Sequence, residues 1–347
     1  METMNYNENL GDSEHLRVDQ ASELQEYLRI MHDSPSALDA QFRPNFSSVD
    51  AYTASTQNLR DLLSQSIGYP PPGLPPTNEA KFQRIAEDDS VLYYRTTIPV
   101  LEGLHVLGLY LVPKNHPLPA PLVIAQHGGN GSPEVATFHD GANYHDMVRG
   151  AVNQGYVVWA PQLMFLAEGY PSDFRSRLDS RARSLGTTIT AIEILKVRRG
   201  LDVVLERSEV DPDRVAMIGL SYGGFYTLYT TALDSRIGTA VSSCYFNDRD
   251  AVLGNAEPFG WNDWRFTNGS LLFKDPEIVA MICPRPLQIQ VGDRDELFPV
   301  EGARREAPSA ARYYKELGCG PNFEYVELEG THEFFGPAAW QFLSKFL

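Results

Sequence analysis

The sequence predicts an α/β protein with a mostly parallel central sheet flanked by helices. Short apolar runs that resemble buried strands recur between residues 122 and 328, and helix-like segments separate them. This alternation is typical of strands joined by right-handed crossovers. The composition agrees, because 43% hydrophobic and 21% charged residues in a chain of 347 are the mixture of a globular protein with a packed core.

The N-terminal part of the chain, residues 1–76, is expected to be a helical arm followed by a connector. Apolar residues recur at helical spacing in two stretches, at Leu24, Leu28 and Met31 and at Leu59, Leu62 and Leu63. The proline-rich run at 69–76 cannot be helix or central strand. We therefore expect it to lead from the arm into one main domain over residues 77–347.

The main domain should begin with an antiparallel pair at 91–100 and 105–113, where β-branched and aromatic residues are frequent. The expected strands of the parallel sheet are 122–126, 156–160, 215–220, 238–243, 286–292 and 323–328. The expected helices are 143–153, 187–207, 223–233, 301–317 and 338 to the end. An aromatic insertion at 245–283, after the sixth expected strand, is long and irregular, which is typical of a lid or a binding loop.

The charge balance argues against nucleic acid and membrane surfaces as partners. With 29 Lys and Arg against 45 Asp and Glu, the formal charge is −16, and an acidic surface repels phosphate backbones and anionic lipids. The cysteines Cys244, Cys283 and Cys319 lack metal-ligand spacing, so no zinc site is expected. No apolar run approaches the ~18 residues of a spanning helix, and the first residues lack a signal-peptide pattern, so a cytoplasmic location is expected.

The most informative motif is Gly219-Leu220-Ser221-Tyr222-Gly223-Gly224, which lies between an expected strand and an expected helix. A turn this tight requires strained backbone angles at Ser221, and its glycine neighbours leave room for them. Such a turn presents the serine hydroxyl at the carboxyl edge of the sheet, as a nucleophile requires. The simpler interpretation is a glycine-rich turn whose serine caps the following helix.

A nucleophilic hydroxyl needs a base and a carboxylate that orients this base. His332 follows the last expected strand in a short loop, from which an imidazole can reach back over the sheet edge. Asp293 and Asp295 both follow the strand at 286–292. Asp295 is preferred because Asp293 can pair with its neighbour Arg294, and Asp293 remains the alternative.

Two backbone N–H groups are expected to stabilise negative charge that develops on a substrate oxygen. The glycines of Gln126-His127-Gly128-Gly129-Asn130-Gly131 allow the backbone to approach a substrate. The donors should be the N–H of Gly129 and the N–H of Tyr222, the residue after the serine. His127 is expected to shape this loop by hydrogen bonding rather than to act as a base.

Four further segments have a familiar pattern: His127-Gly128-Gly129, Gly155-Tyr156-Val157-Val158, Val210-Asp211-Pro212-Asp213-Arg214-Val215 and Cys283-Pro284-Arg285-Pro286-Leu287. Together with the serine turn, they resemble the α/β-hydrolase superfamily, and within it the dienelactone-hydrolase and acetyl-xylan-esterase-like serine esterases. The resemblance covers roughly residue 80 to the end. It implies an α/β-hydrolase fold with Ser221 as nucleophile, His332 as base and Asp295 as acid, and neither a metal nor an organic cofactor. The chain departs from dienelactone hydrolases themselves by carrying serine in place of their cysteine.

The function implied by this resemblance is hydrolysis of a small-molecule carboxylic ester through an acyl-enzyme, with acetylated carbohydrate as the first candidate. Trp261, Trp264 and Phe266 of the insertion are expected to bind substrate, and the alternative is that the two tryptophans pack on the N-terminal arm. A serine peptidase of the prolyl-oligopeptidase kind and a non-catalytic hydrolase-fold binding protein remain open alternatives. A homo-oligomer is also compatible with the sequence.

Overall fold

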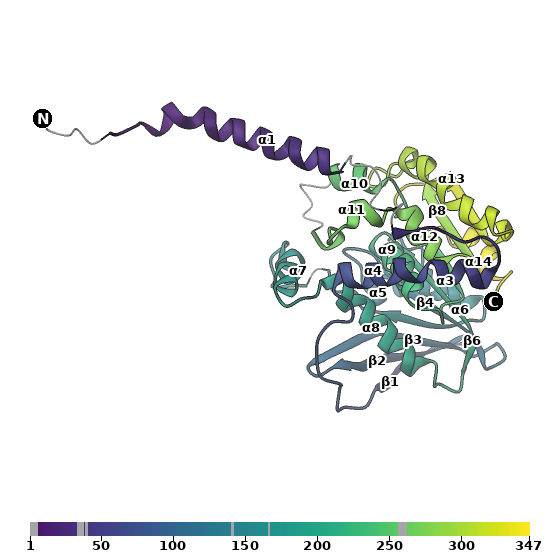
Figure 1. Ribbon diagram of the computed structural model, residues 1–347. Helices are drawn as coiled ribbons and strands as arrows, with labels where there is room; N and C mark the ends of the chain where they lie inside the picture. The colour runs from purple at the N-terminus through teal and green to yellow at the C-terminus, as the bar shows by residue number, and fades with distance from the viewer. Residues whose placement is uncertain (1–5, 33–37, 39–40, 140–141, 166, 256–261) are drawn as a thin grey trace, which may run out of the picture.

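A computed structural model describes residues 6–32, 38, 41–139, 142–165, 167–255 and 262–347 (Figure 1). Its centre is one sheet, whose nine strands in the described part of the chain follow the order β1-β2-β3-β5-β4-β6-β7-β8-β9. The strands from β5 to β9 in this order run parallel, and β1, β2 and β3 form an antiparallel extension at one edge. The predicted mostly parallel α/β sheet is therefore confirmed.

The antiparallel edge consists of β1 (Lys81–Glu87), β2 (Val91–Leu101) and β3 (Leu104–Pro113), and β3 also pairs antiparallel with β5 (Val157–Pro161). The other parallel strands are β4 (Ala120–Gln126), β6 (Val210–Leu220), β7 (Thr239–Ser243), β8 (Leu287–Gly292) and β9 (Phe323–Leu328). Every residue of β4, β5, β7 and β8 is buried, as continuous apolar runs predict for strands covered on both faces.

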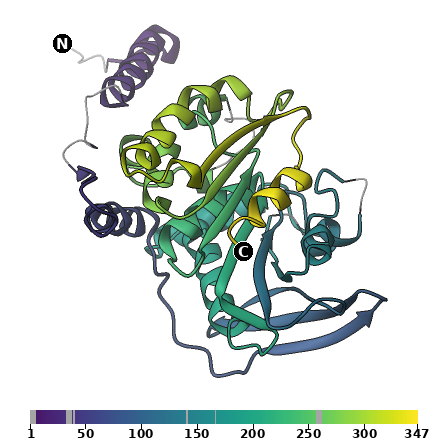
Figure 2. The same cartoon turned by 90° about the vertical axis from the view of Figure 1, so that its right-hand side faces the viewer.

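Helices cover both faces of the sheet (Figure 2). Alternate strand residues belong to the two separate apolar cores between the sheet and these helices. Ile124 and Met217 join a core with α4 (Gln57–Ile67), α8 (Ile189–Val204), α9 (Tyr222–Leu233), α12 (Asp275–Ile282) and α13 (Val300–Glu316). Val123 and Ala216 join a second core with α5 (Pro133–Phe138), α6 (Met147–Asn153) and α14 (Gly336–Leu343). The sheet thus has a filled layer on each side, and loops at its carboxyl edge are free to build a site.

Several elements differ from the sequence-based expectations, and among them the helices α5 and α7 (Phe174–Ser184) were not expected. The edge strand β1 was not expected, because its residues are almost all exposed and read as polar. As a result, the insertion at 245–283 follows the seventh strand rather than the sixth. The insertion is also less irregular than expected, since its described part contains α10 (Arg249–Asn255), the 3₁₀ turn η3 (Asn262–Trp264), α11 (Gly269–Leu272) and α12.

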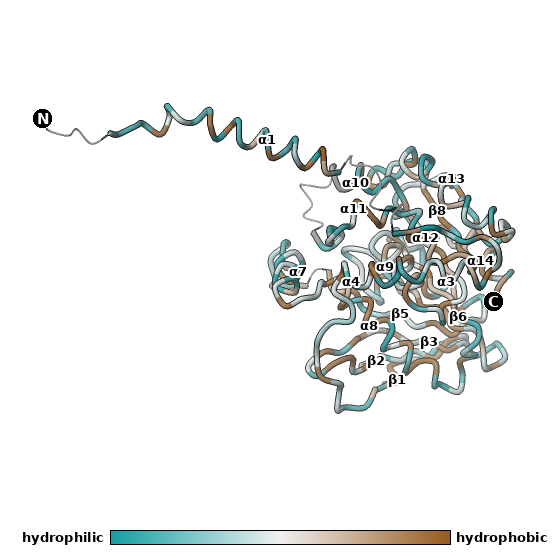
Figure 3. Tube along the Cα trace, viewed as in Figure 1, coloured by the Kyte–Doolittle hydropathy of each residue, from teal (hydrophilic) through white to brown (hydrophobic). Residues whose placement is uncertain are grey.

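The N-terminal region divides into a packed part and a projecting part. Helix α3 (Val49–Ser55) and α4 lie against the body, and Leu59, Leu63 and Ile67 of α4 are fully buried. The 3₁₀ turn η1 (Leu10–Ser13) and α1 (Glu14–His32) instead extend away from the body and bury no residue (Figures 1 and 2). Helix α1 carries both hydrophilic and hydrophobic residues (Figure 3). Among the described residues, no helix combines the length and the apolar character needed to cross a membrane.

Candidate active site

Ser221 occupies the sharp turn between β6 and α9 that the sequence predicts. Its backbone angles are φ 60° and ψ −119°, a strained conformation for a residue with a side chain. Its N–H donates to the Ser243 carbonyl at the end of β7, at 2.9 Å. A Cβ on Gly223 would lie 2.0 Å from the Gln126 carbonyl oxygen, so glycine is required for α9 to start this close to β4. The turn leaves the Ser221 side chain half-buried at the carboxyl edge of the sheet.

His332 and Asp295 form a hydrogen-bonded pair in neighbouring loops that follow β9 and β8. His332 Nδ1 lies 2.8 Å from Asp295 Oδ2. The carboxylate is held in place because its Oδ1 accepts from the N–H groups of Leu297 and Phe298, at 2.9 and 3.0 Å. The side chains of His332 and Asp295 are 17% and 1% exposed, so the imidazole alone reaches solvent. With Nδ1–H donating to the carboxylate, Nε2 is the nitrogen left to accept a proton.

Asp293, the alternative carboxylate, has a different position. Its Oδ1 accepts from the Gly330 N–H at 2.9 Å and lies 3.9 Å from Arg294 Nη1. These contacts join the loop after β8 to the loop that carries His332. The structure therefore brings Asp295 to the imidazole, and Asp293 braces the turn beside it.

The end of β7 links the serine turn to the histidine loop. Ser243 accepts from the Ser221 N–H, and the next residue, Cys244, donates its Sγ–H to the Glu333 carbonyl at 3.4 Å. Phe298 stacks on the His332 ring with centroids 5.6 Å apart and an interplanar angle of 15°. These contacts fix the histidine ring on one side and its loop on the other.

Three side chains of kinds that bind metal ions meet at the site, and their donor atoms lie within 4.8 Å of one another: Cys244, Asp295 and His332. A metal would need the Cys244 thiolate. Burial instead raises the pKa of this thiol, and its proton is directed at a backbone carbonyl. The donor set therefore fits a hydrogen-bonded support for the histidine loop better than a metal centre.

The glycine-rich loop after β4 lies directly against the serine turn. A Cβ on Gly128 would be 3.0 Å from the Ser221 Cβ and 2.7 Å from the Leu220 carbonyl oxygen. The Gly128 N–H donates to the hydroxyl of the buried Tyr144 at 2.9 Å. Burial raises the pKa of Tyr144 to about 12, so this hydroxyl stays protonated. The backbone of this loop is thus close to the serine and held by a side chain from another segment.

His127 shapes this loop, as the sequence predicts. Its Nε2 accepts from the Leu163 N–H at 2.9 Å, and its Nδ1 lies 2.8 Å from the Gly128 carbonyl oxygen. These two contacts define one tautomer, with the proton on Nδ1. Burial lowers the pKa of His127 to about 4, so the ring is neutral around pH 7.

One aromatic ring, that of Phe165, packs against both Gly129 and Tyr222, the two expected N–H donors. Tyr222 is the first residue of α9, where backbone N–H groups have no partner within the helix. The Phe165 ring packs 4.9 Å from the Tyr222 ring and lies 3.3 Å from where a Cβ on Gly129 would be. Phe165 thus contacts both segments that are expected to face the substrate oxygen.

The expected substrate-binding aromatics have different surroundings. Trp264 is 2% exposed and packs 4.5 Å from the Tyr222 ring and 6.0 Å from the Phe298 ring. Phe266 is 6% exposed and packs on Tyr229 and Phe273 instead. Trp261 lies outside the described residues. Trp264 thus lies beside the site, underneath its aromatic lining, and substrate contact stays a prediction for all three residues.

Several site residues were missed by the sequence analysis. Phe298 had a detectable signal, because it follows Asp295 by three residues in a loop already assigned to the site. Tyr144 and Phe165 had none, because they reach the loop after β4 only through the packing of separate segments. Asp263, which accepts from the Tyr222 hydroxyl at 3.0 Å, lies in the insertion without a motif around it.

The sheet order, the strained serine turn after β6 and the histidine loop after β9 define an α/β-hydrolase. The chain belongs to the dienelactone hydrolase family, whose family model matches residues 107–312. This match spans β3 to α13 and includes the serine turn and the Asp295 loop. The predicted family is therefore confirmed, and the chain is a hydrolase-family enzyme.

Known relatives agree with this assignment. The Bacillus subtilis (strain 168) protein YtaP is 27% identical over 246 residues, which are 67% of this chain and 80% of YtaP. A glucuronoyl esterase from Teredinibacter turnerae has a similar structure, with a TM-score of 0.64, 18% identity and coverage of 90% of this chain and 93% of that one. Acetyl xylan esterase 1 from Thermoanaerobacterium sp. has a TM-score of 0.55, 19% identity and coverage of 84% and 93%. At these identities, the two structures show a shared fold.

Proposed function

We propose that the protein is a serine carboxylester hydrolase in which Ser221, His332 and Asp295 act as a catalytic triad. The observation that carries the proposal is the 2.8 Å contact between His332 and a buried, doubly hydrogen-bonded Asp295, in a fold whose strained turn presents Ser221 at the same sheet edge. A carboxylate in this position keeps the imidazole in the tautomer that can accept a proton from a serine hydroxyl.

In the first half of the proposed reaction, Ser221 Oγ attacks the ester carbonyl carbon while His332 Nε2 takes the hydroxyl proton. The resulting tetrahedral intermediate carries its negative charge on the former carbonyl oxygen. The backbone N–H groups of Tyr222 and Gly129 are the proposed donors to this oxygen. Collapse of the intermediate breaks the bond to the alcohol oxygen, which receives the proton from His332, and leaves an acyl-enzyme.

In the second half, water attacks the acyl carbon and gives a proton to His332. The tetrahedral intermediate forms again and collapses with Ser221 Oγ as the leaving group, which recovers its proton from the imidazolium. Asp295 stays ionised throughout and stabilises the imidazolium in both halves. The products are a carboxylic acid and an alcohol, and the enzyme returns to its starting state.

Carbohydrate esters are the proposed substrates, either a sugar hydroxyl that carries a small acyl group or a uronic acid esterified to a small alcohol. Two similar structures bear the names acetyl xylan esterase and glucuronoyl esterase, which supports an ester of a sugar over an ester of a lipid. Phe165, which is half-buried and lies against both Tyr222 and Gly129, suits the apolar face of a sugar ring or a short acyl group.

A hydrolysis panel tests this proposal. We expect the purified chain to hydrolyse p-nitrophenyl acetate, with kcat/KM falling as the acyl chain lengthens to octanoate, and to release acetate from acetylated xylose or methanol from glucuronate methyl ester. A peptide p-nitroanilide in the same panel reports peptidase activity. Turnover of the anilide without turnover of any ester would contradict the proposal, and so would inactivity on every ester.

A further inference from the structure

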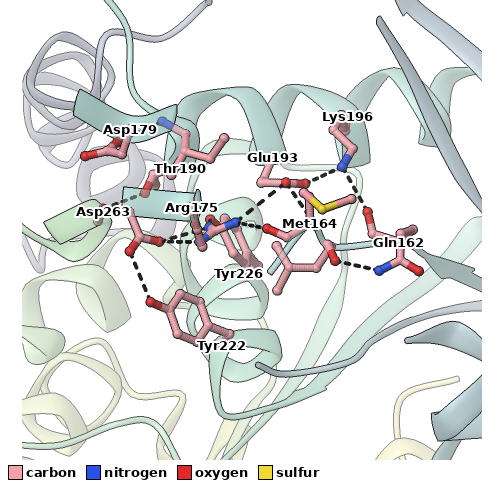
Figure 4. Close-up of polar contacts among 12 residues, drawn as sticks. Gln162, Met164, Arg175, Asp179, Thr190, Glu193, Lys196, Tyr222, Tyr226 and Asp263 are labelled. Carbon is pink, nitrogen blue, oxygen red and sulfur yellow. Dashed lines mark hydrogen bonds and ion pairs between the residues drawn. The ribbon is translucent and has the colours of Figure 1, made fainter. Parts of the chain in front are cut away.

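A network of four buried charges lies next to Tyr222, the residue that follows the proposed nucleophile (Figure 4). Arg175 comes from α7 (Phe174–Ser184), Glu193 and Lys196 come from α8, and Asp263 comes from η3 of the insertion. Their side chains are between 2% and 9% exposed. Arg175 pairs with Asp263 at 2.9 Å and lies 3.8 Å from Glu193, and Glu193 pairs with Lys196 at 2.6 Å. The four formal charges cancel, so the network is neutral as a unit.

This network holds the side chain of Tyr222, whose backbone N–H is a proposed oxyanion donor. The Tyr222 hydroxyl donates to Asp263 Oδ1 at 3.0 Å, and Figure 4 shows the phenol ring pointing toward the carboxylate. The Arg175 guanidinium lies 5.3 Å from the centre of the same ring, and Trp264 packs 4.5 Å from it. Tyr222 is therefore fixed both at its hydroxyl and across its ring.

The same network also holds the segment that supports the second proposed donor. Lys196 Nζ donates to the Gln162 carbonyl at 2.9 Å, and the Met164 N–H donates to Glu193 Oε1 at 3.3 Å. Between these two residues, the Leu163 N–H donates to His127, which shapes the Gly128–Gly129 loop. One set of ion pairs thus anchors the Tyr222 side chain directly and the Gly128–Gly129 loop indirectly, through the segment that bonds His127.

Stability alone is a poor explanation for this arrangement. Charged groups lose hydration on burial, and apolar residues of similar volume often give equal or greater stability than a buried ion pair. An ion network does supply directional contacts, which fix atoms at set positions where apolar packing would allow them to shift. Positioning is valuable beside an oxyanion, because stabilisation of the transition state depends on donors that are already in place.

We propose that Asp263 and Arg175 are positioning residues, which hold the Tyr222 backbone N–H in the orientation that binds the oxyanion. Asp263 acts through the Tyr222 hydroxyl, and Arg175 acts through Asp263 and the Tyr222 ring. The insertion after β7 thereby contributes to the chemistry without contacting the reacting atoms. This inference rests on the proposed esterase function and deepens it by adding residues that no sequence motif contains.

Tyr222→Phe is the test variant, because it removes only the hydroxyl that reaches Asp263. Tyr226→Phe is the matched control: Tyr226 lies one turn further along α9, is equally buried and bonds the same network through Arg175 at 2.7 Å. Asp263→Asn serves as a second variant. It leaves the Arg175 charge buried without its partner, which is strongly destabilising, so its Tm is measured alongside its activity.

We expect Tyr222→Phe to lower kcat on p-nitrophenyl acetate about 10-fold at unchanged KM, less than the 10²–10³ that outright loss of a donor costs. Inhibition by phenylboronic acid, which forms a tetrahedral adduct on the serine oxygen, should weaken by a similar factor. Tyr226→Phe should keep both quantities within about two-fold of the wild type. If Asp263→Asn retains a wild-type Tm, we expect it to lose kcat in the same way as Tyr222→Phe.

Three outcomes would overturn the inference. An active enzyme in which Tyr222→Phe keeps wild-type kcat and boronate affinity would refute it while leaving the esterase function intact. Equal losses in Tyr222→Phe and Tyr226→Phe would show a general structural effect of the network. A wild type that neither hydrolyses esters nor binds the boronate would overturn the proposed function, and the positioning role with it.

Discussion

Asp295 is the residue on which the proposed role of His332 depends most directly. Asp295→Asn keeps the size of the side chain but removes the charge, and its amide can favour the wrong imidazole tautomer. We expect turnover of p-nitrophenyl acetate to fall about 10⁴-fold, as for other triads. The control is Asp293→Asn, which removes the charge but keeps an oxygen that can accept from the Gly330 N–H, and leaves the imidazole contact in place, so it should cost less than about 10-fold. The reverse order of effects would assign the acid role to Asp293.

Glu277 on α12 gives a prediction about stability rather than activity. The residue is 8% exposed, and in the described structure its Oε2 has no hydrogen-bond partner. Burial raises the pKa of Glu277 to about 7, against an ordinary value of 4.5. Because the folded state holds this proton more tightly than the unfolded state, its contribution to stability is complete below pH 4.5 and is lost as the pH rises through 7.

Glu277→Gln removes this pH dependence. A pKa difference of about 2.5 corresponds to about 3 kcal/mol. Relative to the wild type, the free energy of unfolding of the variant should therefore rise by up to about 3 kcal/mol between pH 4.5 and 8.5. Urea unfolding at both pH values measures the change. Glu301→Gln, at an exposed position of α13, is the control and should show almost no pH-dependent difference. A difference in the free energy of unfolding between Glu277→Gln and the wild type that is the same at both pH values would contradict the raised pKa of Glu277.

At the residue scale, the sequence indicates those candidate residues whose position follows from a local turn or strand pattern. Ser221 was predicted because its turn needs glycine neighbours, and His332 and Asp295 were predicted because they follow strands that end at the same edge; their catalytic roles stay predictions. The sequence could not identify Asp263, since a buried carboxylate in a long insertion has no local signature. Its importance arises only when α9 and η3 are packed together, which is a property of the tertiary structure.

At the scale of elements, the close approach of α9 to β4 creates the site. Gly223 permits this approach, because a Cβ there would lie 2.0 Å from the Gln126 carbonyl oxygen. Gly223→Ala should therefore destabilise the protein by more than about 2 kcal/mol, measured as a lowered Tm and urea midpoint. Gly238→Ala is the control, since its Cβ would meet its nearest neighbour at an ordinary 3.6 Å. Equal and small effects of the two changes would mean that α9 can shift without cost.

The elements that sequence reasoning found were those with strong patterns. The continuous apolar runs of β4, β6 and β8 predicted buried strands, and α8, α9 and α13 began within two residues of the expected positions. The edge strand β1 was missed because it is exposed, so it has no apolar pattern to detect. The helices of the insertion were missed because short apolar segments there fit strand, helix and loop equally well.

For the whole molecule, the N-terminal arm raises the question of where the domain begins. We propose that the unit required for folding starts near α3 rather than at residue 77, because α4 belongs to the main core whereas α1 buries nothing. A truncation that removes residues 1–32 should keep the wild-type Tm and esterase activity. Leu63→Ala, at a fully buried position in α4, should cost about 2–5 kcal/mol.

These two changes test the proposed boundary by calorimetry and by urea unfolding. A large loss of Tm on truncation would mean that α1 stabilises the body, either through contacts within the chain such as His32–Asp250 at 3.0 Å or through a second copy of the chain, and a measured molar mass would separate the two cases. A negligible effect of Leu63→Ala would instead restore the boundary expected from the proline-rich run. The activity of the truncated chain also shows whether the arm takes part in substrate binding.

The identity of the nucleophile is tested most directly by Ser221→Ala together with covalent labelling. We expect the variant to fold with an unchanged Tm and to lose about 10⁶-fold in turnover of p-nitrophenyl acetate, the loss typical of a removed triad nucleophile. A fluorophosphonate should add its mass to the wild-type peptide that contains Ser221 and leave the variant unlabelled. A Ser221→Ala enzyme that retains a tenth of wild-type turnover, or a label on another residue, would contradict the proposed mechanism.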